Sequence, residues 1–139
     1  MEVGHAERRS LFGEDTAVVA RKMSTVLEAG LTPLLCIGEH RKVAPNDAAL
    51  FCAEQVRSAL GDHVNGDPER LSSVLLAYEP LWAIGALAPT DPAYVDRVVA
   101  VLHKAPTRAL WHRYRHHLWG ERRPGAASPS WLRGWPVLG

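Results

Sequence analysis

Residues 77–85, which read AYEPLWAIG, place a glutamate between an apolar run and a loop that begins with proline. Residues 74–78 are continuously apolar apart from a tyrosine hydroxyl, as expected of a strand buried on both faces of a parallel sheet. We therefore expect Glu79 at a strand tip, beside a loop that carries Trp82 and can close. Proton abstraction next to a carbonyl needs such a carboxylate in a site from which water is excluded.

Two helices and another strand are predicted before this segment. Asp15 is a candidate N-cap for the first helix, and Asn46 or Asp47 for the second, which Gly61 closes. Between them, residues 34–37 are a short apolar run of the kind that forms a buried strand. The inner faces of the two helices are expected to carry Val19, Met23, Val26 and Leu27, and Ala49, Cys52, Ala53, Val56 and Leu60.

A third helix follows the glutamate segment and completes an alternating pattern. Residues 63–69 are polar and predict a loop, and Asp91 begins a helix whose inner face is expected to carry Val95, Val98, Val99 and Leu102. Strands separated by helices of this length predict βαβ units and an α/β fold with a parallel sheet. This pattern alone does not separate a closed barrel from a doubly wound sheet.

A second motif, GHAERR at residues 4–9, places His5 at another expected strand end. Taken alone, a histidine near an N-terminus is typical of a solvated surface. Together with residues 77–85 and with LCIGE at residues 35–39, the motif resembles the triosephosphate isomerase family, and the match covers about 100 of the 139 residues. The resemblance implies that residues 1–104 form a partial (β/α)8 barrel, from the end of the fourth strand through the sixth helix.

The resemblance also implies roles for individual residues. His5 would be the neutral hydrogen-bond donor to the substrate carbonyl and Glu79 the base, an arrangement for which triosephosphate isomerase is itself the standard example. The backbone N–H of Gly85 would bind the substrate phosphate when the lid closes. Glu7 and Trp82 would support the site. The reaction interconverts dihydroxyacetone phosphate and glyceraldehyde 3-phosphate through an enediolate, and the resemblance implies no cofactor and no metal.

The chain departs from the family pattern beside both motifs. Ala6 stands where the family usually has serine, and residues 86–88 read ALA where the family has Thr-Gly-Lys. These departures support an alternative within the family, an isomerase for a four-carbon ketose phosphate. In the third motif, Cys36 is expected to be a packed core thiol and Glu39 a polar support near the barrel mouth.

Other parts of the family site have no counterpart in this sequence. The family's first strand supplies a lysine whose charge stabilises the enediolate, and a later backbone cradle binds the phosphate. We therefore expect the 139-residue chain to be an inactive fragment. The resemblance implies that the binding partner is a small phosphosugar, the substrate of the family. The intact family forms homodimers, an assembly that a partial barrel does not guarantee.

Composition changes near residue 105. Residues 1–105 hold 10 Lys and Arg against 14 Asp and Glu, whereas residues 106–139 hold six Arg, one Glu and four of the five tryptophans. We expect residues 105–139 to be an irregular Arg- and Trp-rich tail. We favour a shifted reading frame, because codons for residues 118–125 can be chosen so that the next frame spells YGGSAAPG, close to the family's phosphate cradle. One alternative is a genuine C-terminal extension. The other, which we favour least, is a non-enzymatic interaction module that contacts nucleic acid through this basic tail.

The sequence carries no sign of secretion or of membrane insertion. No apolar stretch approaches the roughly 18 residues of a membrane span, and the N-terminus lacks the regions of a secretory signal. Cys36 and Cys52 are too few for a disulfide framework and lack C-x-x-C spacing. We expect a cytoplasmic protein with reduced thiols.

Overall fold

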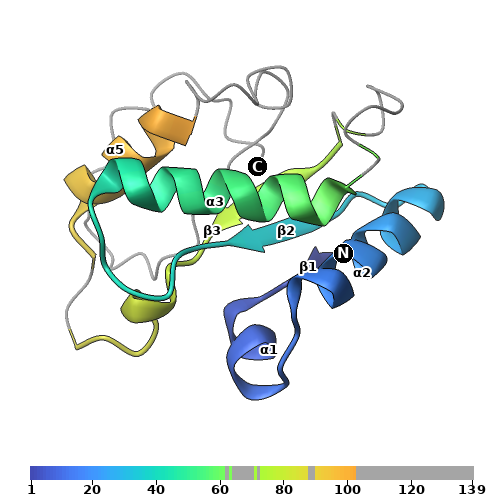
Figure 1. Ribbon diagram of the computed structural model, residues 1–139, viewed down its shortest axis with the longest axis horizontal. Helices are drawn as coiled ribbons and strands as arrows, with labels where there is room; N and C mark the ends of the chain where they lie inside the picture. Colours follow the sequence, from blue (N-terminus) through green and yellow to red (C-terminus); the bar gives the residue numbers. More distant parts are fainter. Residues whose placement is uncertain (62, 64–70, 72, 88–89, 103–139) are drawn as a thin grey trace, which may run out of the picture.

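The computed structural model describes residues 1–61, 63, 71, 73–87 and 90–102, which form three parallel strands and the helices that connect or follow them (Figure 1). The strands are β1 (Glu2–Val3), β2 (Leu34–Ile37) and β3 (Leu75–Tyr78). The helices are α1 (Ala6–Leu11), α2 (Thr16–Glu28), α3 (Pro45–Leu60), the short 3-10 helix η2 (Leu81–Ala83) and α5 (Pro92–Leu102).

The sheet has the order β1-β2-β3, and both strand pairs are parallel. Glu2 lies opposite Leu34 in the register of β1 with β2, and Ile37 lies opposite Tyr78 in that of β2 with β3. Since parallel strands point the same way, the residues that follow the three strands meet at one edge of the sheet. The predicted α/β fold with a parallel sheet is therefore confirmed.

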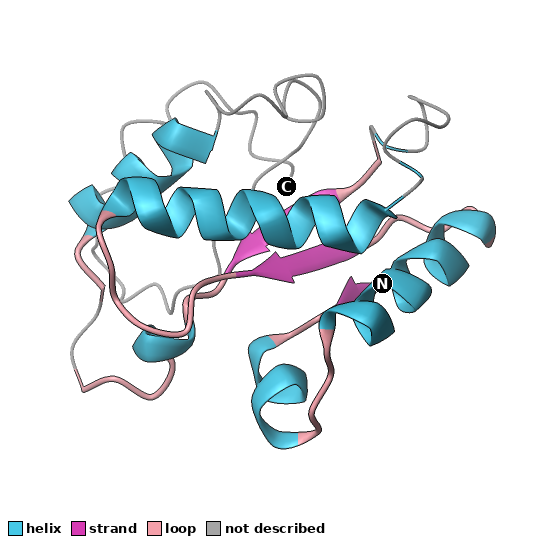
Figure 2. Cartoon of the chain, viewed as in Figure 1, coloured by secondary structure: helices cyan, strands magenta, loops and turns pink. Residues whose placement is uncertain are grey.

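Helix α3 lies along the sheet, contacts β2, and packs against α2 on one side and α5 on the other (Figure 2). Apolar side chains of these helices and of the strands form one buried cluster. Its most completely buried large members include Met23 of α2, Leu35 of β2, Leu60 of α3, Leu76 of β3 and Leu102 of α5.

Helix α2 begins and is buried as the sequence predicts. Asp15 is its N-cap, and the carboxylate oxygen accepts a hydrogen bond from the N–H of Val18 at 2.8 Å. The side chains expected on the inner face, Val19, Met23, Val26 and Leu27, are all buried.

Helices α3 and α5 each correct one expectation. The N-cap of α3 is Ala44, without a side-chain hydrogen bond, rather than Asn46 or Asp47. Pro45 explains the earlier start, because its fixed φ suits the first helical position and its missing N–H would be unpaired there. In α5 the buried residues are Tyr94, Val98 and Leu102, while the expected Val95 and Val99 are only partly buried.

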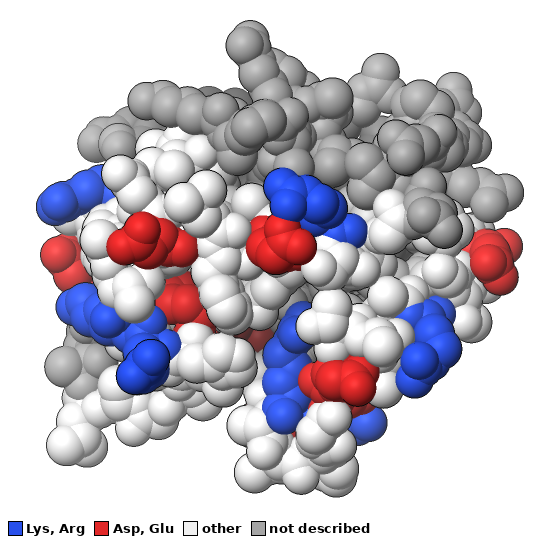
Figure 3. Space-filling model, viewed as in Figure 1, with Lys and Arg blue, Asp and Glu red and all other residues white. Residues whose placement is uncertain are grey.

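Glu14, between α1 and α2, carries a buried carboxylate that accepts hydrogen bonds from Arg8 and Lys22 and forms ion pairs with both. Its side chain is 5% exposed. Hydrogen bonding by Lys22, followed by that from Arg8 and by their charges, lowers the pKa of Glu14 against the opposing effect of burial. Elsewhere on the face in Figure 3, acidic and basic side chains are interspersed.

Several expectations fall outside the described residues. The Arg- and Trp-rich tail at 105–139, with its proposed nucleic-acid contacts, lies outside them, and so does most of the loop expected at 63–69. Within the described part, no helix combines the length and the apolar character that a membrane span requires.

Candidate active site

His5 lies between β1 and α1, where it serves as the N-cap of the helix. Its Nδ1 accepts a hydrogen bond from the backbone N–H of Glu7 at 3.3 Å. A ring nitrogen that accepts a hydrogen bond carries no proton, so the neutral ring has its proton on Nε2. Gly4, at φ 73°, allows the sharp turn that brings the chain from the strand into this cap.

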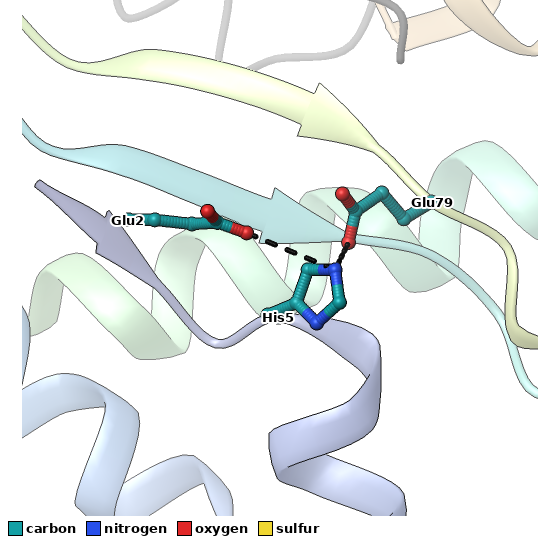
Figure 4. Close-up of side chains that lie close together, drawn as sticks. All are labelled: Glu2, His5 and Glu79. Atoms are coloured by element: carbon teal, nitrogen blue, oxygen red, sulfur yellow. Dashed lines mark ion pairs between the residues drawn. The ribbon is translucent and has the colours of Figure 1, made fainter. Parts of the chain in front are cut away.

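Glu79 follows β3, and its carboxylate points toward His5 (Figure 4). The Oε2 atom of Glu79 lies 3.7 Å from Nε2 of His5, although 74 positions separate the two residues in the chain. The Glu79 side chain is only 13% exposed, and its Oε2 atom is buried without a hydrogen-bond partner in the described part of the chain.

A close backbone contact fixes the position of Glu79 relative to β2. A Cβ atom placed on Gly38 would lie 2.2 Å from the carbonyl oxygen of Glu79 and 2.7 Å from the nitrogen of Pro80. The N–H of Glu79 also donates to the carbonyl of Ile37 at 2.7 Å. Gln55 of α3 holds Gly38 from the other side, since its amide accepts from the Gly38 N–H at 2.8 Å and donates to the Gly38 carbonyl at 3.2 Å.

Cys36 and Arg9 line a small depression next to Glu79. Burial, and then the negative charge of Glu79, raises the pKa of the Cys36 thiol well above its usual range, so the thiol stays protonated. The guanidinium of Arg9 donates to the carbonyls of Gly4 at 2.8 Å and of Cys36 at 3.4 Å, which ties the ends of β1 and β2 together. Burial lowers the pKa of Arg9 from its ordinary high value.

Glu39, which follows β2, is the centre of a second group of polar side chains. Its carboxylate is 3% exposed and accepts from the hydroxyl of Tyr78 at 2.9 Å, the indole N–H of Trp82 at 2.8 Å and the hydroxyl of Tyr94 at 3.0 Å. Burial and the bond to Glu39 raise the pKa of Tyr94 to about 12, so the phenol remains a donor at neutral pH. Nζ of Lys42 lies 5.2 Å from the ring centroid of Trp82.

The loop after Glu79 is fixed at its first residues and exposed farther on. The N–H of Leu81 donates to the carbonyl of Glu39 at 2.9 Å, and Trp82 is anchored by the bond described above. Ile84, Gly85 and Leu87 are exposed, and Gly85 has a φ of 73°.

The structure thus brings His5 and Glu79 together and connects Trp82 to them through Glu39 and the strand ends. Glu7 contributes its backbone N–H, and Gly85 is exposed on the loop. The sequence reasoning missed Gln55, whose contact with Gly38 follows from no motif. It also missed Tyr94 and Glu2, whose carboxylate lies 3.8 Å from His5.

Comparison with known proteins places this geometry in context. The family model described as triosephosphate isomerase matches residues 1–115. Triosephosphate isomerase from Mycobacterium tuberculosis is 41% identical over 102 residues, which are 73% of this chain and 38% of the relative. That from Thermus thermophilus is 39% identical over 113 residues, covering 81% of this chain and 42% of the relative.

A relative with a different name matches more of the chain. L-erythrulose-1-phosphate isomerase from Pectobacterium atrosepticum is 36% identical over 129 residues, which are 92% of this chain and 49% of the relative. The chain therefore spans less than half the length of each of these three relatives.

Proposed function

Since the chain belongs to the triosephosphate isomerase family, we propose that its described residues form part of an active site that interconverts an aldose phosphate and a ketose phosphate. The observation that carries the proposal is the approach of His5 Nε2 to within 3.7 Å of Glu79 Oε2 at the carboxyl ends of parallel strands. We further propose that residues 1–104 are a partial (β/α)8 barrel whose catalytic groups lie at this end of the strands.

In this proposal Glu79 and His5 act on adjacent atoms of the substrate. The Glu79 carboxylate removes a proton from the carbon next to the carbonyl, and the electron pair left behind forms the enediolate. The Nε2–H of His5 donates a hydrogen bond to the oxygen on which negative charge develops; triosephosphate isomerase is the known example of a neutral histidine in this role. Nε2 of His5 gives its proton to this oxygen and takes the hydroxyl proton of the neighbouring oxygen. Glu79 then returns the carbon-bound proton to the adjacent carbon, which completes the isomerisation without a net gain or loss of protons.

The phosphate of the substrate is assigned to the loop after Glu79. The Gly85 N–H would bind it when the loop closes, and Trp82 would anchor the fixed end of that loop through Glu39. The exposure of Gly85 supports this assignment, because the N–H of an exposed loop residue is accessible to a ligand.

The proposal is tested by building residues 1–102 into the matching segment of the Mycobacterium relative and assaying the chimera. Isomerisation is expected, and Glu79→Gln should lower kcat by about 10²–10⁴-fold, the usual contribution of a general base. The matched control is Glu28→Gln, which removes the same charge from an exposed position on α2 and should leave kcat unchanged. Equal activity of the two variants in a folded chimera would contradict the role of Glu79.

A four-carbon ketose phosphate is the second candidate substrate. The relative named L-erythrulose-1-phosphate isomerase aligns with 92% of this chain. Ala6 and the ALA sequence at 86–88 also depart from the usual triosephosphate isomerase motifs. The ratio of kcat/KM for L-erythrulose 1-phosphate to that for dihydroxyacetone phosphate, measured on the same chimera, decides between them. A ratio well above one would favour the four-carbon substrate, and a ratio well below one the triose phosphate.

A further inference from the structure

Three side chains that can ligate a metal converge where β1 and β3 end. Glu2 comes from β1, His5 from the turn that follows it, and Glu79 from the residue after β3. One ligand atom of each lies within 4.8 Å of the other two, and Figure 4 shows the two carboxylates on either side of the imidazole. The proposed isomerisation gives Glu2 no role, so this convergence calls for a separate explanation.

The separations leave room for an ion between the three side chains. Nε2 of His5 lies 3.8 Å from Oε1 of Glu2 and 3.7 Å from Oε2 of Glu79, both longer than a hydrogen bond. Zinc binds nitrogen and oxygen ligands at roughly 2.0–2.2 Å, so two ligands of a tetrahedral ion are about 3.4 Å apart. The oxygens of Glu2 and Glu79 lie within 4.8 Å of each other, and the Glu2 side chain, which is 49% exposed, is free to move closer to the ion.

The charges of the cluster favour a cation. Within the described residues, the ion pairs of Glu2 and Glu79 are those with His5, and Oε1 of Glu2 also accepts a hydrogen bond from the Cys36 thiol at 3.6 Å. Oε2 of Glu79 is buried and accepts no hydrogen bond there. A buried carboxylate oxygen without a partner is costly, and a cation bound between the two carboxylates would remove that cost.

We propose that Glu2, His5 and Glu79 bind one divalent transition-metal ion, with zinc the best match among the common ions. A set of one imidazole and two carboxylates suits zinc, whereas magnesium and calcium prefer oxygen ligands throughout. Three protein ligands leave a fourth position for water. The site does not depend on the proposed isomerase function, since it requires only the convergence of these side chains.

Metal binding and the proposed proton transfer exclude each other. A metal at His5 needs the lone pair of Nε2, so the ring proton must move to Nδ1 and the hydrogen bond from the Glu7 N–H is lost. The metal also occupies the Glu79 carboxylate that would act as the base. Zinc is therefore expected to inhibit any isomerase built from these residues.

The test is a zinc titration of the full 139-residue chain by calorimetry, compared with Glu2→Gln and with Glu28→Gln as the control for lost charge. Removing a ligand should weaken zinc binding about tenfold or more, since even the loss of an outer partner costs that much. The control should bind as the unaltered chain does. Should Glu2→Gln lose its fold by circular dichroism, Glu2→Asp, which keeps the charge and withdraws the oxygen, replaces it with the same expectation.

Cobalt(II) distinguishes this site from sites made of thiols. A site of one nitrogen and two oxygen ligands gives visible d–d bands without the near-ultraviolet band of a cobalt–thiolate bond. Absence of zinc binding, unchanged affinity in the folded Glu2 variant, or a thiolate band that accounts for the whole spectrum would each overturn the proposal. These experiments measure zinc and cobalt binding, so a negative result would refute the metal site without bearing on the isomerase function, which the assay of the chimera tests separately.

Discussion

Replacing Gly38 by alanine places a methyl group against the backbone that carries Glu79. The added carbon would lie 2.2 Å from the Glu79 carbonyl oxygen and 2.5 Å from its carbon. Both are backbone atoms held by the sheet, so β2 and the segment after β3 must separate by roughly 1 Å to reach even a tight contact. Overpacking of this kind costs about 1–3 kcal/mol. We expect the upper end, about 3 kcal/mol, because no flexible side chain can yield.

Gly30→Ala is the matched control for this substitution. Gly30 has a φ of 69°, and an added Cβ would meet nothing within 4 Å, so alanine there costs only about 1 kcal/mol of left-handed strain. Urea denaturation followed by far-ultraviolet circular dichroism gives both free energies of unfolding. In the chimera, a displacement of Glu79 by about 1 Å should also lower kcat by about 10²-fold. A loss of stability in Gly38→Ala no larger than that in Gly30→Ala would refute the steric argument.

Three further predictions follow from single side chains. Tyr94→Phe removes one donor from the buried Glu39 carboxylate and should lower the free energy of unfolding by about 1.5–3 kcal/mol, measured by urea titration; an unchanged midpoint would contradict the assigned bond. Glu14 has a lowered pKa, so the stability it contributes is present above the ordinary glutamate pKa and is lost as pH falls through the lowered value. Below about pH 5 the urea midpoint should therefore fall less steeply in Glu14→Gln than in the unaltered chain. The substitution itself should cost about 1 kcal/mol, because Arg8, one of the two partners of Glu14, is half exposed. Burial, and then the charge of Glu39, raises the pKa of Cys52 above its usual range, so peptide mapping should find this thiol unmodified by iodoacetamide at about pH 8 until urea unfolds the chain.

We predict that the 139-residue chain by itself has no isomerase activity. Positioned charge supplies much of the rate in such reactions. Within the described residues, Glu79 forms an ion pair with His5 and none with a lysine or an arginine. Turnover of dihydroxyacetone phosphate by the purified chain, lost in Glu79→Gln, would contradict this prediction.

Local patterns predicted the elements that depend on neighbouring residues. The strand at Leu34–Ile37 and the Asp15 cap of α2 follow from an apolar run and a capping side chain, and both were correct. The start of α3 was missed because two good capping residues outweighed a proline one position earlier. The fixed φ of Pro45, rather than a side-chain hydrogen bond, decides where α3 begins.

The candidate site shows what sequence patterns cannot supply. His5 and Glu79 were expected to meet because the family resemblance placed both at strand ends. Tyr94 was missed because a polar group on a helix is normally assigned to solvent, whereas its hydroxyl reaches Glu39 across 55 positions of sequence. Glu2 was missed because a two-residue strand at the start of the chain gives no alternation from which to infer its direction.

The tautomer of His5 tests the central claim most directly. The claim is that the Glu7 N–H holds Nδ1 unprotonated, so that Nε2 presents its proton beside Glu79. Two-bond ¹⁵N–¹H correlation spectra of the full chain at about pH 8, in metal-free buffer, report the tautomer of each of the seven histidines, and His5→Asn identifies the signal. We predict a protonated Nε2 and an unprotonated Nδ1. A proton on Nδ1 of His5 would contradict the proposed role of this residue.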